Sequence, residues 1–269
     1  MLVRFVKDFW LGLSSYYEAL VMIFQYNLWL FFLIPIVLSV SMFFGGEYLL
    51  DQLKQVNIEG EINRINFESE LNDISFKGFP KDAAEMKLLV IGLKIIFVVV
   101  SLRLRKYVIL ILLAPVMAIL STKAEKLQTG NKYPFSFDRW VSDIYRGINF
   151  ALRNMFRQVV ILAGWYIVVL IVPELDFLSF WVIFGVGSYY YGASLMDYTH
   201  ERMRMSMEES IRFIRKNSGL ALSLGTVFSI LFFTDYIGIV LAPIVGVIAA
   251  TYAIDQKVDL KKNKYAKKT

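Results

Sequence analysis

The stretch LLAPVMAILSTKAEK, from Leu112 to Lys126, runs from apolar residues through a proline into lysine and glutamate. A related stretch, VLAPIVGVIAATYAIDQK, follows much later, from Val240 to Lys257. Apolar runs of this kind enter lipid bilayers, and a lysine at the end of a run is typical of the membrane surface. The two stretches raise one question, which is whether each crosses a membrane or enters it and returns.

The composition is that of a membrane protein. Of the 269 residues, 57% are hydrophobic and 16% are aromatic, and the mean hydropathy of +0.54 lies above that of ordinary soluble domains. The many aromatic residues suit the two interfaces of a bilayer. We therefore expect the lipid bilayer to be the immediate partner of this chain.

The residues that usually carry catalysis and metal binding are scarce. The chain has no cysteine and a single histidine, His200, so it offers neither a disulfide nor a thiolate metal site. The sequence contains no phosphate loop, nucleophile motif or nucleotide fingerprint, and its basic residues flank apolar runs as membrane orientation requires. We expect no enzymatic activity, cofactor, metal or nucleic-acid partner, and we expect His200 to be a polar residue in a cytoplasmic loop.

Apolar runs divide the chain into membrane segments. The first, residues 28–46, is long enough for a crossing of about 20 residues, and the second, residues 88–120, is interrupted by RLRK at 103–106. Two pairs of shorter runs follow, 159–173 with 177–196 and 219–234 with 237–254. The pattern predicts an all-α integral membrane protein.

The charges between these runs predict the orientation. Residues 47–87 carry nine acidic and five basic residues, whereas residues 121–158 carry seven basic and three acidic ones, and the tail from Asp255 carries six and two. Because cytoplasmic loops are enriched in lysine and arginine, both termini are predicted to be cytoplasmic and residues 47–87 to lie outside. Most of the formal net charge of +6 then faces anionic lipid.

Two arrangements of the opening stretch are open at this point. Either residues 88–120 form one long tilted helix, or residues 88–102 cross and residues 107–120 lie partly in the inner leaflet, with a break near Pro115. Residues 219–234 raise a related question, because such a helix spans only about 24 Å against about 30 Å of hydrocarbon. The two later pairs are therefore predicted either to cross fully or to be re-entrant hairpins.

The N-terminal segment, residues 1–20, has the pattern of an amphipathic helix. Arg4, Lys7 and Glu18 fall on one face. Apolar residues recur at helical spacing on the opposite face: Leu2, Phe5, Val6, Phe9, Trp10 and Leu13. We predict a helix that lies in the plane of the membrane interface and does not span the bilayer.

Basic residues mark two further predicted helices. Residues 138–158 bring four arginines near one another: Arg139, Arg146, Arg153 and Arg157. Such a stripe either gathers anions ahead of a pore or meets anionic lipid. In residues 206–217, the spacing of Ser206 and Glu209 predicts a capping box, Glu208 and Arg212 an ion pair, and Arg215 a favourable helix end.

Several features occur in an order that is known from one family. They are Ala114, Pro115, Leu120, Ser121, Lys123, Glu125 and Gly130, then Asp197, Tyr198, Arg202, Ser206, Arg212, Arg215 and Gly219, and finally Pro243. In their order and spacing the chain resembles, over nearly its whole length, the family that joins the sulfate permease CysZ and the etoposide-induced 2.4-type membrane proteins.

The resemblance implies a single membrane domain, residues 1–269, with two long transmembrane helices and two short helical hairpins that penetrate the bilayer only partly. Carried onto this chain, the parts are an interfacial helix 1–20, long helices 24–57 and 82–122, an extracytoplasmic cap 58–81, an interfacial helix 138–158, a hairpin 159–196, a cytoplasmic helix 206–217, a hairpin 219–254 and a basic tail 255–269. The opening stretch is then the inner end of a crossing helix.

The same resemblance implies a homo-oligomer in the bacterial inner membrane and, for the CysZ branch, permeation of sulfate. In that branch the turn that enters the first long helix carries a Gly-Leu-Arg-type anion motif, with backbone N–H groups at a helix start beside an arginine. The corresponding residues here are QYNLW, from Gln25 to Trp29. Tyr26 and Asn27 remain as candidate anion ligands, without a cation beside them.

A second group of candidate anion ligands comprises Arg103, Arg105 and Lys106. Cations inside an apolar run cost about 2.5–3.5 kcal/mol each on insertion scales, so they are functional candidates. Their alternative role is to reach the cytoplasmic headgroups with long side chains.

Two functions fit these observations. The first is a multipass permease or channel-like protein for a small inorganic anion, sulfate by resemblance. The second is a non-transporting membrane organiser that binds lipids or partner helices, which the missing arginine in the turn 25–29 favours.

Overall fold

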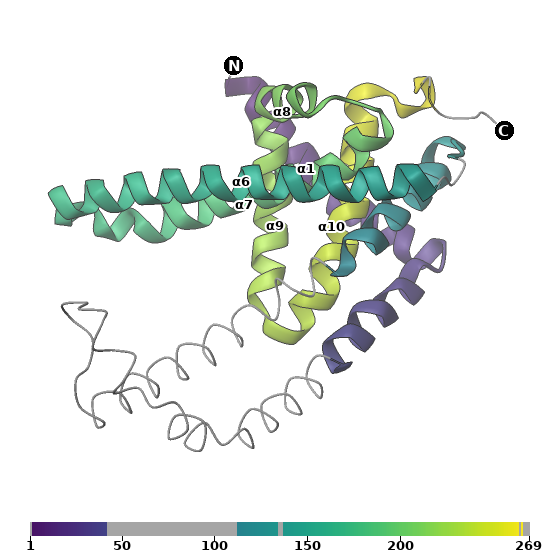
Figure 1. Ribbon diagram of the computed structural model, residues 1–269, viewed down its shortest axis with the longest axis horizontal. Coiled ribbons are helices and arrows are strands. Elements are labelled where there is room, and N and C mark those ends of the chain that lie inside the picture. The colour runs from purple at the N-terminus through teal and green to yellow at the C-terminus, as the bar shows by residue number, and fades with distance from the viewer. Residues whose placement is uncertain (1, 42–111, 134–136, 264, 266–269) are drawn as a thin grey trace, which may run out of the picture. The chain divides into compact units, whose positions relative to one another are not determined.

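The computed structural model describes residues 2–41, 112–133, 137–263 and 265, and its elements are helices (Figure 1). No β-strand is present in these ranges. Nearly all of the described residues belong to one compact unit, formed by residues 1–36 and 110–269. The predicted cap 58–81 lies outside the described residues, as do residues 42–57 of the predicted long helix 24–57 and residues 82–111 of the predicted long helix 82–122.

The first helix, α1 (Leu2–Gln25), packs on α9 and α10 through a face that is small and polar toward its start and more apolar toward its end. The buried residues of α1 are Asp8, Gly12, Ser15, Tyr16, Ala19, Met22 and Ile23. Leu2, Val6 and Trp10, from the predicted apolar face, are exposed. An apolar face turned outward suits contact with lipid. That α1 lies in the plane of the membrane stays a prediction.

The chain turns sharply after α1. The helical segment Leu28–Ser41, which begins with η1 (Leu28–Phe32), is inclined by 102° to α1. Asn27 makes the turn in the left-handed backbone conformation, with φ of 54°, which asparagine adopts more readily than most residues because its short polar side chain can bond locally. Tyr26 and Asn27 therefore form the corner itself.

The helices α6 (Phe137–Ile171) and α7 (Ser179–Arg202) form a hairpin, joined by η3 (Pro173–Leu178), and lie side by side in Figure 1. Pro173 starts η3, a position where its missing N–H group costs nothing. The helix α6 is continuous through residues 158 and 159. The sequence placed a boundary there, between an interfacial helix and a hairpin.

The next helix, α8 (Met207–Lys216), starts with the predicted capping box. The Glu209 N–H donates to Ser206 Oγ over 3.2 Å, and the Ser206 N–H donates to Glu209 Oε2 over 2.7 Å. The predicted ion pair between Glu208 and Arg212 is not formed in the part of the chain that the structure describes. After a bend of 88° the chain continues as α9 (Ser218–Phe233) and returns as α10 (Asp235–Val258), followed by η4 (Leu260–Lys262).

The helix α9 is central, packed against α1, α7 and α10. Glycines bring the backbones of α7 and α9 together: a Cβ atom on Gly192 would overlap a carbonyl oxygen of α9, and one on Gly225 would overlap the carbonyl oxygen of Ser188. Gly219 meets the carbonyl of Phe5 in α1 in the same way. Such close packing holds helices together in lipid, where the hydrophobic effect between them is weak.

Among the described residues, Tyr145–Ile171 and Ile237–Val258 are long and apolar enough to cross a membrane. Only 6% of the apolar window of the first is buried, against 78% for the second. Two bent pairs pass the same test together, Leu2–Gln25 with Leu28–Ser41 and Met207–Lys216 with Ser218–Phe233. The apolar helix Tyr145–Ile171, which is so little buried, requires lipid or a partner around it. The prediction of an all-α integral membrane protein is confirmed.

Candidate functional site

The first and last long helices of the described chain, α1 and α10, are joined by an ion pair near the start of one and the end of the other. Lys257, in the last turns of α10, forms an ion pair with Asp8 of α1, whose side chain is only 2% exposed. Arg4 lies 3.8 Å from the same carboxylate and donates to Asn217 Oδ1, at the junction of α8 and α9, over 3.1 Å. The start of α1, the start of α9 and the end of α10 therefore share one polar cluster.

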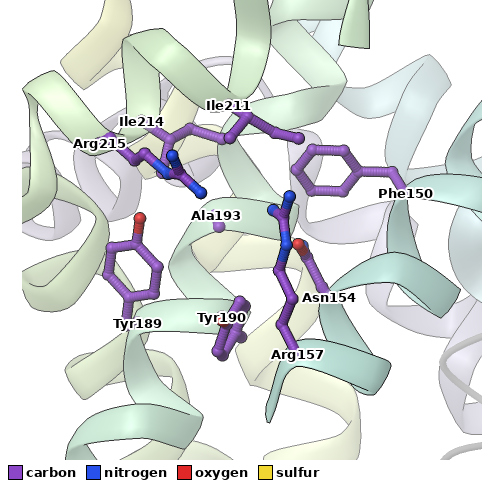
Figure 2. Close-up of a pocket in the computed structure, with 9 residues that line it drawn as sticks. All are labelled: Phe150, Asn154, Arg157, Tyr189, Tyr190, Ala193, Ile211, Ile214 and Arg215. Carbon is purple, nitrogen blue, oxygen red and sulfur yellow. The ribbon is translucent and has the colours of Figure 1, made fainter. Parts of the chain in front are cut away.

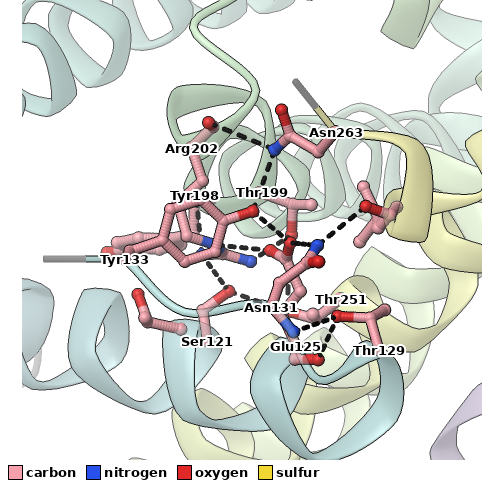
Figure 3. A network of polar contacts seen from close by, with 12 residues as sticks. Ser121, Glu125, Thr129, Asn131, Tyr133, Tyr198, Thr199, Arg202, Thr251 and Asn263 are labelled. Carbon is pink, nitrogen blue, oxygen red and sulfur yellow. Dashed lines mark hydrogen bonds and ion pairs between the residues drawn. The ribbon is translucent and has the colours of Figure 1, made fainter. Parts of the chain in front are cut away.

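A second polar network lies where the helix of residues 112–129 meets α7 and α10 (Figure 3). Arg202 donates from Nε to Glu125 Oε2 over 2.7 Å and from Nη1 to Ser121 Oγ over 2.8 Å. The other carboxylate oxygen, Glu125 Oε1, accepts from Asn131 Nδ2 over 3.1 Å and from the Tyr133 hydroxyl. Both carboxylate oxygens thus have donors.

This network has a structural role, because it connects the helix of residues 112–129 with α7 and α10. Its ion pair is buried, with Glu125 fully covered and the Arg202 side chain 8% exposed. Burial, and next the hydrogen bond to Glu125, raise the pKa of the Tyr133 hydroxyl above its usual range, so this group stays a donor. Thr251 of α10 joins the network through a hydroxyl contact of 2.7 Å with Ser121. An anion would have to displace Glu125 to reach Arg202, so the network holds no free binding site.

A third cluster joins α6, α7 and α8. Arg146 donates from Nη2 to Asp197 Oδ1 over 3.0 Å and from Nη1 to the carbonyl of Met205. Ser210 Oγ lies 2.7 Å from Asp197 Oδ1 and 2.8 Å from His200 Nδ1. Because the single hydroxyl proton goes to the carboxylate, His200 must donate from Nδ1, and its Nε2 carries a lone pair.

The sequence predicted a position in a cytoplasmic loop for His200, and the structure instead shows a helical position. It lies in α7, which continues to Arg202, and its side chain is fully buried. Its ring contacts Phe213 edge-on at 4.8 Å. Burial, and next the charges of Arg146 and Arg202, lower the pKa of His200 to about 3. The imidazole is therefore neutral at physiological pH. In the described part of the chain no group of three or more acidic or histidine side chains could hold a metal ion.

A small cavity lies between α6, α7 and α8 (Figure 2), with a volume of about 80 Å³. The described residues that line it are Phe150, Asn154, Arg157, Tyr189, Tyr190, Ala193, Ile211, Ile214 and Arg215. Figure 2 shows the guanidinium groups of Arg157 and Arg215 turned into the same space, one from α6 and one from α8. None of the described lining residues is acidic, so the cavity has a positive lining.

The amide of Asn154 completes the polar side of this cavity. Its residue is 6% exposed, and its Nδ2 atom has no hydrogen-bond partner among the described residues. A buried donor without a partner costs about 1–3 kcal/mol. The sequence pattern did not single out Asn154, and it assigned Arg215 no role in anion binding. The signal that was present is the spacing of Asn154 and Arg157, which at i and i+3 share one helical face.

The structure places the five predicted anion ligands as follows. Arg103, Arg105 and Lys106 lie outside the described residues. Tyr26 is 41% exposed, and Asn27 is at the first position before η1 without a capping hydrogen bond from its side chain. The cavity between α6, α7 and α8 contains neither of these two residues.

The four arginines of the predicted basic stripe do not act as one surface. Arg146 is bound to Asp197, Arg153 is exposed beside Met207, with 3.4 Å from Nη1 to Sδ, and Arg157 lines the cavity. The side chain of Arg139 lies outside the described part. Of the described members, Arg157 alone remains as a cation turned into a cavity without an acidic partner.

The residues that carried the resemblance occupy structural positions. Glu125 and Arg202 form the buried ion pair, Asp197 binds Arg146, and Gly219 is the close contact with α1. Gly130 has a φ of 77°, which side chains other than that of glycine rarely adopt. These residues therefore specify how the helices meet.

Exposed apolar helices around buried ion pairs define a polytopic helical membrane protein. The chain belongs to the family described as Sulfate transporter CysZ/Etoposide-induced protein 2.4, which matches residues 15–251, most of its length. The resemblance noted in the sequence is thereby confirmed. No curated protein matches the chain.

Proposed function

We propose that the protein is a multipass permease or channel-like protein for a small inorganic anion, with sulfate as the first candidate. The observation that carries the proposal is the family match over residues 15–251, on a chain with the helical membrane fold described above. The printed description of the family names sulfate transport. The proposal assigns no enzymatic reaction to the chain, in keeping with a family of transporter type.

We place the protein in the bacterial inner membrane, with both termini in the cytoplasm, as a homo-oligomer. The contact between Asp8 and Lys257 supports the placement of both termini on the same side of the membrane, since it joins the start of α1 to the end of α10. The exposed apolar surface of α6 and α7 supports oligomerisation, because such a surface needs lipid or another protein around it.

One observation favours the alternative, a membrane organiser without transport. The tip of the hairpin formed by α6 and α7 exposes large aromatic side chains, among them Phe177 at 72%, Phe180 at 60% and Trp181 at 66%. Aromatic residues of this kind anchor proteins at membrane interfaces and are enriched where proteins contact one another. A lipid-binding or partner-binding hairpin would have the same surface.

Uptake of radiolabelled sulfate into proteoliposomes tests the proposal against the alternative. Protein-free liposomes give the background, and an Arg103→Gln/Arg105→Gln variant tests the arginines that the sequence placed inside an apolar run. A permease raises the uptake rate above background. An organiser, shown to be intact by gel filtration, leaves it at background.

A further inference from the structure

We propose that the cavity between α6, α7 and α8 is a binding site for one tetrahedral oxyanion, held by the guanidinium groups of Arg157 and Arg215 and the side-chain amide of Asn154. The inference rests on the proposed function only where it identifies this oxyanion with the transported solute. As a binding site the cavity is testable by itself.

Charge is the first reason. Arg146 and Arg202, the arginines in the buried clusters of this unit, each meet a carboxylate within 3.0 Å. Arg157 and Arg215 form no ion pair with any carboxylate among the described residues. Two guanidinium groups turned into one space repel each other, and an anion between them would replace this repulsion by attraction. A planar guanidinium binds the oxygens of sulfate or phosphate in pairs, which suits this pocket.

The Asn154 amide is the second, independent reason. Buried side-chain donors in native structures nearly always have a partner, and Asn154 Nδ2, in a residue that is 6% exposed, has none within the described part of the protein. Asn154 lines the same cavity as the two arginines. An anion in the cavity would accept a hydrogen bond from Asn154 Nδ2 and charge-assisted hydrogen bonds from the guanidinium groups of Arg157 and Arg215.

The size of the cavity limits the ligand. About 80 Å³ is several times the roughly 15 Å³ that one water molecule needs, and far below the 300 Å³ or more of pockets for drug-sized molecules. A single sulfate or phosphate group fits this range, whereas a nucleotide does not. Apolar side chains, including Phe150 and Ile214, form other parts of the wall, and Arg215 closes it on the solvent-exposed side.

The position of the cavity leaves two sources for the oxyanion. Arg215 lies in the last turn of α8, directly before α9 starts at Ser218, at the end of the unit where Asp8 binds Lys257. In the proposed orientation this is the cytoplasmic surface of the membrane. Both dissolved sulfate and the phosphate of an anionic lipid headgroup reach such a site, and both offer the same tetrahedral group of oxygens.

Binding measurements on the detergent-purified full-length protein separate these sources. In the first arm, equilibrium dialysis measures the affinity for radiolabelled sulfate. In the second, native mass spectrometry counts bound phosphatidylglycerol against phosphatidylcholine. Arg157→Gln and Arg215→Gln each remove one guanidinium from the cavity, and the matched controls Arg153→Gln and Arg212→Gln remove an arginine that does not line it, one turn earlier on the same helices.

We expect Arg157→Gln and Arg215→Gln each to weaken binding about tenfold or more, in line with the loss of a hydrogen bond to a charged group, and the two controls to leave it unchanged. Asn154→Asp places a negative charge of the same shape between the arginines. It should abolish anion binding while the new ion pair preserves the fold, so it remains informative if an arginine variant does not fold.

Either arm supports the site if it shows this pattern, and the arm that responds identifies the source. Absence of binding in both arms, or equal binding by cavity and control variants, overturns the site and leaves water as the partner of Asn154. Sulfate flux measured in parallel separates the two proposals. Binding without flux keeps the site and rejects the permease. Flux that Arg157→Gln leaves unchanged keeps the permease and rejects only the identification of the bound oxyanion with the transported solute.

Discussion

Arg202 and Glu125 form a buried ion pair of 2.7 Å although they lie 77 positions apart in the chain. The pair connects the end of the opening stretch, residues 112–126, to the end of α7. A buried ion pair is favourable only where further hydrogen bonds satisfy its other atoms, and here Ser121, Asn131 and Tyr133 supply them. The pair therefore fixes how the helix of residues 112–129 docks on α7.

Removing one partner of this pair should destabilise the protein strongly. Arg202→Gln leaves the Glu125 carboxylate buried without its cation, which costs about 3–5 kcal/mol. Thermal unfolding in detergent measures the loss. The double variant Glu125→Gln/Arg202→Gln should recover part of it, because no charge is then left uncompensated.

Lys262→Gln is the control for that comparison. Its ion pair with Asp259 has side chains that are 82% and 46% exposed, and exposed pairs contribute little. An equal loss of stability in Lys262→Gln and Arg202→Gln would show that the buried pair has no special role.

The close contact between α7 and α9 makes a second prediction. A Cβ atom on Gly192 would overlap a backbone carbonyl oxygen of α9, so Gly192→Ala must push the helices apart, at a cost of about 1–3 kcal/mol. Gly185 lies on the same helix with no atom within 4 Å of such a Cβ. Gly185→Ala should be neutral or slightly stabilising, since alanine favours helix. Similar unfolding temperatures of the two variants would refute the close contact.

The buried His200 predicts a dependence of stability on pH. Its pKa in the folded protein is lowered from 6.5 to about 3, so between these values the unfolded chain binds a proton that the folded protein does not. The free energy of unfolding should therefore be independent of this group above pH 6.5 and should fall as the pH is lowered, by at most about 1.4 kcal/mol per pH unit.

Denaturant unfolding between about pH 8 and about pH 4.5 checks this behaviour against His200→Gln, which keeps a donor for Ser210 but has no titratable group. The variant should show a shallower slope below the ordinary histidine pKa of about 6.5. Identical slopes would mean that His200 is not the group that titrates.

Labelling of single cysteines tests the depth of the hairpin formed by α9 and α10. The chain has no native cysteine, so labelling of an introduced cysteine is measured without background. Thr234→Cys places the thiol at the exposed turn between the two helices. The 16 residues of α9 span about 24 Å, less than the roughly 30 Å of hydrocarbon. We expect the introduced thiol to be protected from a membrane-impermeant reagent added outside. Rapid labelling from outside would show a full crossing.

Local pattern was enough to predict much of this fold. The helices, the apolar runs that indicate a membrane protein and the capping box at Ser206 and Glu209 all depend on residues a few positions apart. The structure confirms all three predictions. The family was recognised from residues such as Glu125 and Arg202, but their roles were not, because sequence spacing does not show which distant side chains meet.

The candidate site was harder to predict for the same reason. The cavity takes its residues from α6, α7 and α8, and Asn154 becomes notable only when burial leaves its Nδ2 without a partner among the described residues. Arg215 had a sufficient local explanation at the end of α8. His200 was misplaced because α7 continues to Arg202, beyond the end of the apolar run.

Sulfate flux through proteoliposomes is the most direct test of anion permeation. Purified wild-type protein and the control variant Arg153→Gln/Arg212→Gln should take up radiolabelled sulfate faster than protein-free liposomes, and Arg157→Gln/Arg215→Gln should reduce the rate about tenfold or more. Uptake by intact, reconstituted wild-type protein that does not exceed the protein-free rate would contradict sulfate permeation by this chain.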